Sequence, residues 1–177
     1  MFNSRSPLVL VPARNGLIAG ALGFCLLLVL YFIGKHPFLF MIFFDFRIFL
    51  FGIFMVFTLR EIRDGHQAGI IFFWQGMIAN LLFTFVFAAI TSGLIWILCL
   101  LFPVFLSDYV TTAVEQMKAI PVEAIERIGK SEFNRNLEYL SATNGYILAK
   151  HYCKQSFVIS FFISIIISVI LRRQPKN

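Results

Sequence analysis

The sequence predicts an all-α, polytopic membrane protein with four transmembrane helices and a short extracytoplasmic helical layer between the third and the fourth. Three observations predict this fold class. The 177 residues are 59% hydrophobic and only 14% charged, whereas soluble domains average about 25% charged residues. Their mean hydropathy is +0.85. Long apolar stretches, suited to crossing a bilayer, occur at about residues 16–34, 40–64, 71–103 and 155–172. We therefore treat residues 1–177 as a single membrane domain.

The first predicted span, about residues 16–34, follows a short polar stretch that contains Arg5 and Arg14. A basic start resembles a signal peptide. However, the apolar run is long and no small-residue cleavage site follows it, so we expect a retained helix. Gly16 and Gly20 lie about one turn apart and form a surface on which another helix can pack closely.

The second predicted span, about residues 40–64, contains two charges, and its start has two interpretations. A helix that begins at Phe38 places Asp45 and Arg47 near mid-membrane, where a charge costs at least ~2.5 kcal/mol, so both would need partners such as Asn80. A helix that begins near Asp45 places that carboxylate at the positive helix end and lets Arg47 extend to the outer interface. We favour the second placement. Residues two apart on a helix point roughly 200° from each other, so we do not expect the two side chains to pair.

The third predicted span, within residues 71–103, is the one around which the chain is organised. Residues 72–102 carry no charge in 31 positions, which is more than a bilayer crossing needs. Small and polar residues recur along it every four positions and share one helix face: Gly76, Asn80, Thr84, Ala88 and Ser92. In lipid, such a face is where a neighbouring helix packs closely.

Residues 107–154 differ in character and predict a small helical layer outside the bilayer. They contain six acidic and six basic residues, and apolar residues return at helical spacing. Pro121 suits the start of a short helix over residues 122–128 that Gly129 would end, and Ser131 is a suitable N-cap for the next helix. We expect the apolar stripes of this layer to lie on the membrane or on the ends of the spans. A disordered loop is the alternative.

The last predicted span, about residues 155–172, carries a serine every fourth position among Ile, Phe and Val: Ser156, Ser160, Ser164 and Ser168. We interpret this stripe as a packing face whose hydroxyls bond to backbone carbonyls of their own helix, and a polar conduit is the alternative. It complements the small faces of the first and third spans, and we predict that these three helices pack together.

The charges predict the orientation of the chain. The net charge is +6, but the basic residues flank apolar spans instead of forming one soluble basic module, which argues against a nucleic-acid partner. In a four-span arrangement most of the basic residues near span ends fall on one side: Arg5, Arg14, Arg60, Arg63, Arg172, Arg173 and Lys176. The short connection on the other side offers only Lys35. The positive-inside rule therefore predicts that both termini are cytoplasmic.

The junction between the second and third spans resembles a known family. It carries Arg63-Asp64, then Gly69 in the turn, then Phe73-Trp74-Gln75-Gly76-Met77. This pattern is similar to that of small bacterial inner-membrane proteins catalogued as a domain of unknown function, number forty-one ninety-nine. The order of four spans, a helical segment before the last and a basic end agrees over nearly the whole chain. The resemblance implies fold and location in a bacterial inner membrane, and no activity.

No residue pattern in the chain predicts catalysis, a cofactor or a metal site. Cys25, Cys99 and Cys153 form no ligand motif, and the histidines are scattered among span ends. We expect an accessory or scaffold protein that acts through its outer segment on a membrane-protein partner or on a second copy of itself. The alternative is a small transporter or channel subunit that uses Asp45, Arg47 and Asn80, because ionisable groups inside a span are often functional.

Overall fold

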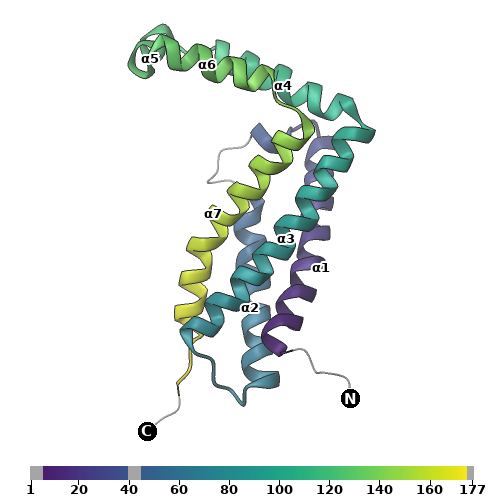
Figure 1. Cartoon of the computed structure of the whole chain (residues 1–177), viewed down its shortest axis with the longest axis vertical. Helices are drawn as coiled ribbons and strands as arrows, with labels where there is room; N and C mark the ends of the chain where they lie inside the picture. The colour runs from purple at the N-terminus through teal and green to yellow at the C-terminus, as the bar shows by residue number, and fades with distance from the viewer. Residues whose placement is uncertain (1–5, 40–44, 175–177) are drawn as a thin grey trace.

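Helices make up all the regular elements in the described part of the chain, residues 6–39 and 45–174 of a computed structural model, as the sequence predicts (Figure 1). The only pairing of extended residues there is an isolated antiparallel bridge between Ile71 and Arg173. The helices are α1 (Pro7–Phe32), the 3-10 helix η1 (Pro37–Leu39), α2 (Phe46–His66), α3 (Phe73–Leu101), α4 (Pro103–Lys118), α5 (Val122–Ile128), α6 (Lys130–Ser141) and α7 (Gly145–Leu171).

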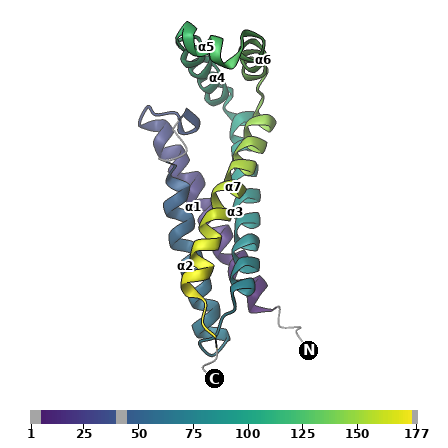
Figure 2. The ribbon, with the colours of Figure 1, turned by 90° about the vertical axis from the view of Figure 1, so that its left-hand side faces the viewer.

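Four long helices stand side by side as a bundle, and three shorter ones cross one of its ends. Figures 1 and 2 show α1, α2, α3 and α7 in the bundle, with α4, α5 and α6 projecting sideways beyond it. We call residues 103–141, which comprise α4 to α6, the arm. The first turn of α1 and the last turn of α7 both lie at the end opposite the arm.

The predicted packing of the first, third and last helices is confirmed, with α3 between α1 and α7. A Cβ atom added to Gly16 would lie 2.6 Å from the backbone oxygen of Phe83, so α1 approaches α3 as closely as glycine permits. A Cβ atom on Gly76 would lie 2.9 Å from Oγ of Ser168 on α7. The predicted packing residues on α1 and α7 are all buried: Gly16, Gly20, Ser156, Ser160, Ser164 and Ser168.

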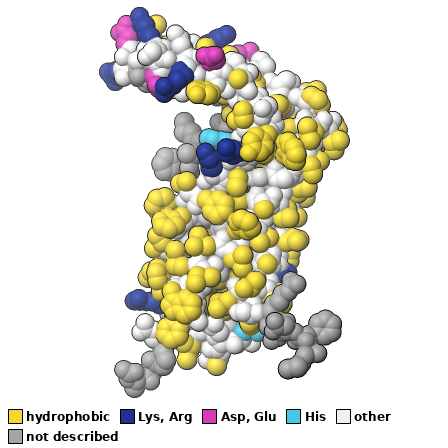
Figure 3. Space-filling model, viewed as in Figure 1, with side chains coloured by type: hydrophobic (Ala, Val, Ile, Leu, Met, Phe, Trp, Pro, Cys, Tyr) yellow, Lys and Arg dark blue, Asp and Glu magenta, His cyan; other side chains and the backbone are white. Residues whose placement is uncertain are grey.

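Aromatic rings fill the centre of the bundle where α2 meets α3. The ring of Phe51 lies 4.8 Å from that of Phe87 and 6.1 Å from that of Phe83, centroid to centroid, and all three side chains are fully buried. Outside this core the bundle remains apolar. Figure 3 shows hydrophobic side chains along the bundle, whereas most of the charged groups visible there gather on the arm and near the bundle's ends.

Three of the described helices are long and apolar enough to cross a membrane: α1, α3 and α7. These helices indicate a membrane protein. The helix α2 is not among them. Its uncharged stretch, residues 48–59, is only twelve residues long, and Arg60 and Glu61 follow it.

Several predicted helix boundaries are wrong. The helix α1 begins at Pro7, well before residue 16, because a proline in the first turn needs no hydrogen-bond donor there. The helix α7 begins at Gly145, since Asn144 caps it by accepting a 2.9 Å hydrogen bond from the Ile147 amide. Residues 145–154 are therefore continuous with the last apolar helix and do not belong to a separate outer segment.

The arm forms the short helices that the sequence predicts, but the predicted N-cap of the last of them, Ser131, is wrong. Residues 122–128 are helical and end at Gly129 as expected, but Gly129 is also the N-cap of α6, and its φ of +97° suits glycine. Ser131 therefore lies inside α6. The first turns of α4 rest on the bundle end, where Phe105 is buried, and α6 packs on α4.

Candidate functional site

The predicted site residues Asp45 and Arg47 form a buried ion pair where α2 begins. Arg47 is only 3% exposed. Its Nε lies 2.8 Å from both carboxylate oxygens of Asp45, and its Nη2 also donates to Asp45. Its Nη1 donates to the carbonyl oxygen of Tyr152 at 3.2 Å and to Oγ of Ser156 at 3.0 Å. The guanidinium carbon lies 4.3 Å from the centre of the Tyr152 ring, so the cation is neutralised, hydrogen-bonded and covered.

This pair corrects two predictions. The helix does begin near Asp45, as favoured, with Phe46 as its first residue, but Arg47 is buried and does not extend to an interface. The two side chains meet because Asp45 is the N-cap residue and lies outside the helical geometry on which the 200° argument rests. From that position its carboxylate accepts the Arg47 amide at 2.9 Å as well as the guanidinium. The network fastens the start of α2 to α7.

Asn80 is separate from this pair, contrary to the suggestion that it could be a partner. Its Nδ2 donates to Oγ of Ser168 at 3.3 Å, while Arg47 contacts Ser156. These two serines are twelve positions apart on α7, which corresponds to about 18 Å along a helix. The structure therefore does not bring Asp45, Arg47 and Asn80 to one site. The other side-chain atom of Asn80, Oδ1, is buried and has no hydrogen-bond partner among the described residues.

The remaining predicted motif residues organise the turn between α2 and α3. Arg63 Nε donates to Asp64 at 2.7 Å, and Arg63 Nη1 lies 3.5 Å from the carbonyl oxygen of Leu171 at the end of α7. Gln75 accepts the Phe72 amide at 3.0 Å and so caps the start of α3. Trp74 is exposed, and Gly76 lies against α7. These contacts give the motif a structural role in holding three helix ends together.

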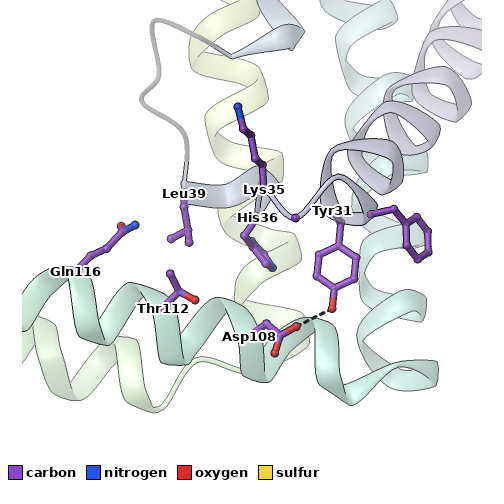
Figure 4. Close-up of a pocket in the computed structure, with 9 residues that line it drawn as sticks. Tyr31, Lys35, His36, Leu39, Asp108, Thr112 and Gln116 are labelled. Carbon is purple, nitrogen blue, oxygen red and sulfur yellow. Dashed lines mark hydrogen bonds between the residues drawn. The ribbon is translucent and has the colours of Figure 1, made fainter.

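A cavity of about 670 Å³ lies between the arm and the end of α1, at the opposite end of the bundle from that turn. Figure 4 shows residues of α4 on one side and residues of the α1–η1 connection on the other. The polar residues that line it are Tyr31, Lys35, His36, Asp108, Thr112 and Gln116. The hydroxyl of Tyr31 donates to Oδ2 of Asp108 at 2.7 Å and joins the two walls.

His36 lines this cavity and belongs to a cluster of aromatic rings. Its ring centre lies 4.8 Å from that of Phe105 and 5.4 Å from that of Tyr109. Its Nε2 lies 3.1 Å from the Phe105 carbonyl oxygen, which can only accept, so this nitrogen carries the proton. Burial lowers the pKa of His36, although the Phe105 carbonyl and the charge of Asp108 oppose the shift. Burial therefore favours the neutral form of this imidazole over the charged form.

Sequence patterns do not reveal this cavity, because its two walls come from segments about seventy positions apart. The sequence does contain part of the signal for this site. Lys35, His36 and Asp108 all fall next to predicted span ends, and those ends belong to the same predicted side of the membrane. Nothing in local spacing places Asp108 opposite Tyr31.

The fold and this site define a class: an apolar helical bundle of the membrane-protein type, with a helical arm and a polar cavity beneath it. The chain belongs to the family described as "Protein of unknown function (DUF4199)", whose model matches residues 14–173. The family resemblance drawn from the junction between the second and third spans is thus confirmed. No match is found among curated proteins or among solved structures.

Proposed function

We propose that the chain is a four-span protein of a bacterial inner membrane, with α2 as the fourth span, both termini in the cytoplasm and the arm outside. Support for α2 comes from its place in the bundle and from Asp45, which neutralises Arg47 and reduces the cost of burying that end. Support for the orientation comes from basic residues near three helix ends: Arg14 is near the start of α1, Arg60 is near the end of α2 and Arg172 follows α7. These helix ends lie opposite the arm (Figure 1).

We further propose that this protein is an accessory or scaffold component whose arm binds another membrane protein. The observation that carries this proposal is that α6 is amphipathic, yet none of its residues is fully buried. The helices α5 and α6 are seven and twelve residues long, and helices this short are marginal in water without tertiary contacts. A partner surface would supply the burial that the bundle does not.

The charge of the arm favours a protein over the lipid surface as that partner. Residues 103–141 contain six acidic and four basic residues, a net charge of −2. Anionic lipid headgroups attract basic segments, so they would not hold this one electrostatically. The proposal assigns no catalytic role to the chain. It also sets aside a transport path through Asp45, Arg47 and Asn80, since Asp45 and Arg47 neutralise each other and Asn80 lies at another level of the bundle.

Photo-crosslinking in intact cells tests the role of the arm. A photoreactive amino acid at Tyr139, an exposed residue of α6, should yield one adduct of defined protein mass. The matched control is Phe162, an exposed residue of the apolar helix α7, which should yield lipid adducts only. Two differently tagged copies of the chain distinguish a second copy from another protein. Labelling of lipid alone from Tyr139 would contradict the proposal and indicate an arm that rests on the membrane.

A further inference from the structure

The polar cavity beneath the arm adjoins a second cavity of opposite character. This second cavity has a volume of about 390 Å³ and is almost wholly apolar. It lies where the ends of α1 and α3 meet the start of α4, and its lining includes Leu28, Leu98, Phe102 and Val104. Tyr31 and Phe32 line both cavities. A polar and an apolar compartment thus share one wall at a single end of the bundle.

The lining of the polar compartment includes one basic and one acidic residue. Among the described residues that line it, Lys35 and Asp108 are the basic and the acidic one, and His36 is the third titratable side chain next to them. Figure 4 shows Asp108 on α4, whereas the Lys35 side chain extends from the α1–η1 connection in the direction away from α4. Thr112 and Gln116 add hydroxyl and amide groups that can either donate or accept hydrogen bonds. Such a compartment suits a ligand that itself carries separated negative and positive groups.

We propose that the two cavities together bind one phospholipid whose headgroup carries both a phosphate and a primary ammonium group. The ammonium group of the headgroup donates to Asp108, and the phosphate lies on the side of the α1–η1 connection, where the flexible Lys35 side chain can turn toward it. One acyl chain enters the apolar compartment past Phe32. Volumes of several hundred Å³ with few, convergent polar groups are typical of small-molecule sites. The position at the end of three membrane-type helices places the polar compartment where headgroups lie and the apolar one where chains lie.

Native mass spectrometry of the full chain in detergent tests this proposal. We expect one phosphatidylethanolamine to bind per chain, more tightly than phosphatidylcholine, whose quaternary ammonium cannot donate to Asp108, and more tightly than phosphatidylglycerol, which has no cation. Asp108→Asn should weaken phosphatidylethanolamine binding about threefold, in the range of an exposed ion pair. The control Glu115→Gln, on the same helix but outside the cavity lining, should leave binding unchanged.

A second variant tests the apolar compartment independently of any effect on charge. Val104 lines that cavity and is 61% exposed, so Val104→Trp can fill the cavity without disturbing the core. Binding should weaken about tenfold for every two methylene groups that the indole excludes. The control is Val158→Trp on α7, where the valine is 59% exposed and does not line the cavity.

Two results would overturn the proposal. Equal binding by all variants would show that the lipid is held only by general contact with the apolar bundle. Competition by soluble phosphoethanolamine, together with an unaffected Val104→Trp variant, would show that the site takes a free phosphorylated amine and not a lipid. Thermal unfolding of each variant verifies that it is folded. If Asp108→Asn is unfolded, Val104→Trp decides the matter alone.

Discussion

Neutralising Asp45 should destabilise the bundle far more than breaking an exposed ion pair. In Asp45→Asn the helix cap can persist, because an amide oxygen can still accept the Arg47 amide. The guanidinium, however, loses its counter-charge while its side chain is only 4% exposed. Leaving one charge of a buried pair uncompensated costs about 3–5 kcal/mol. Because Tyr152 and Ser156 still accept from Nη1, we expect the lower end, about 3 kcal/mol.

A double-mutant cycle identifies the source of this loss. Arg47→Met should also destabilise, because it leaves the carboxylate without its partner. The double variant Asp45→Asn/Arg47→Met should be more stable than the sum of the single changes predicts, by about 2 kcal/mol, because it contains no buried charge. The free energy of unfolding is measured by circular dichroism during titration with sodium dodecyl sulfate in mixed micelles.

The exposed pair of Arg14 and Glu61 supplies the matched control. Its Nη2–Oε2 distance is 2.6 Å, but its side chains are 56% and 36% exposed. Arg14→Gln should therefore reduce the free energy of unfolding by less than about 1 kcal/mol. If Asp45→Asn loses no more than Arg14→Gln, or if the cycle is additive, burial does not strengthen the Asp45–Arg47 pair and our reasoning is refuted.

Three further predictions concern packing, orientation and pH. Gly16→Ala should lower the free energy of unfolding by about 1–3 kcal/mol, since its new Cβ would lie 2.6 Å from a backbone oxygen of α3. The control Gly93→Ala should be tolerated, because no atom lies within 4 Å of that Cβ position. Equal effects in the same unfolding titration would mean that close packing of α1 on α3 is unimportant. In a chain without its native cysteines, a cysteine at Ser131 should react with an impermeant maleimide outside intact cells and one at His66 should not, and the reverse pattern would invert the proposed orientation. The free energy of unfolding should decrease as the pH falls below 6.5, the ordinary pKa of histidine, because the unfolded chain takes up a proton that buried His36 resists. His36→Leu should flatten this decrease, and an unchanged profile would assign it to another group.

Much of the bundle could be predicted from the sequence, because its signals are local and periodic. Residues 72–102 must form a helix in lipid, where every backbone polar group needs an internal partner. The four-residue spacing of Ser156, Ser160, Ser164 and Ser168 places them on one face whatever the helix packs against. Only the tertiary structure shows which helix packs on which face: Gly16 of α1 lies against α3, and Gly76 of α3 lies against α7.

The tertiary structure decided the chemistry of the polar groups. Asp45 and Arg47 looked like two unpaired charges because helical geometry was assumed for both, whereas a cap residue turns its side chain back along the chain. Tyr152 and Ser156 of α7, which hydrogen-bond to Arg47, lie more than a hundred positions further along the chain. The cavity beneath the arm likewise joins Tyr31 to Asp108. Hydropathy and spacing determine which segments become helices, but contacts between distant segments determine which charges are buried, paired or left facing a cavity.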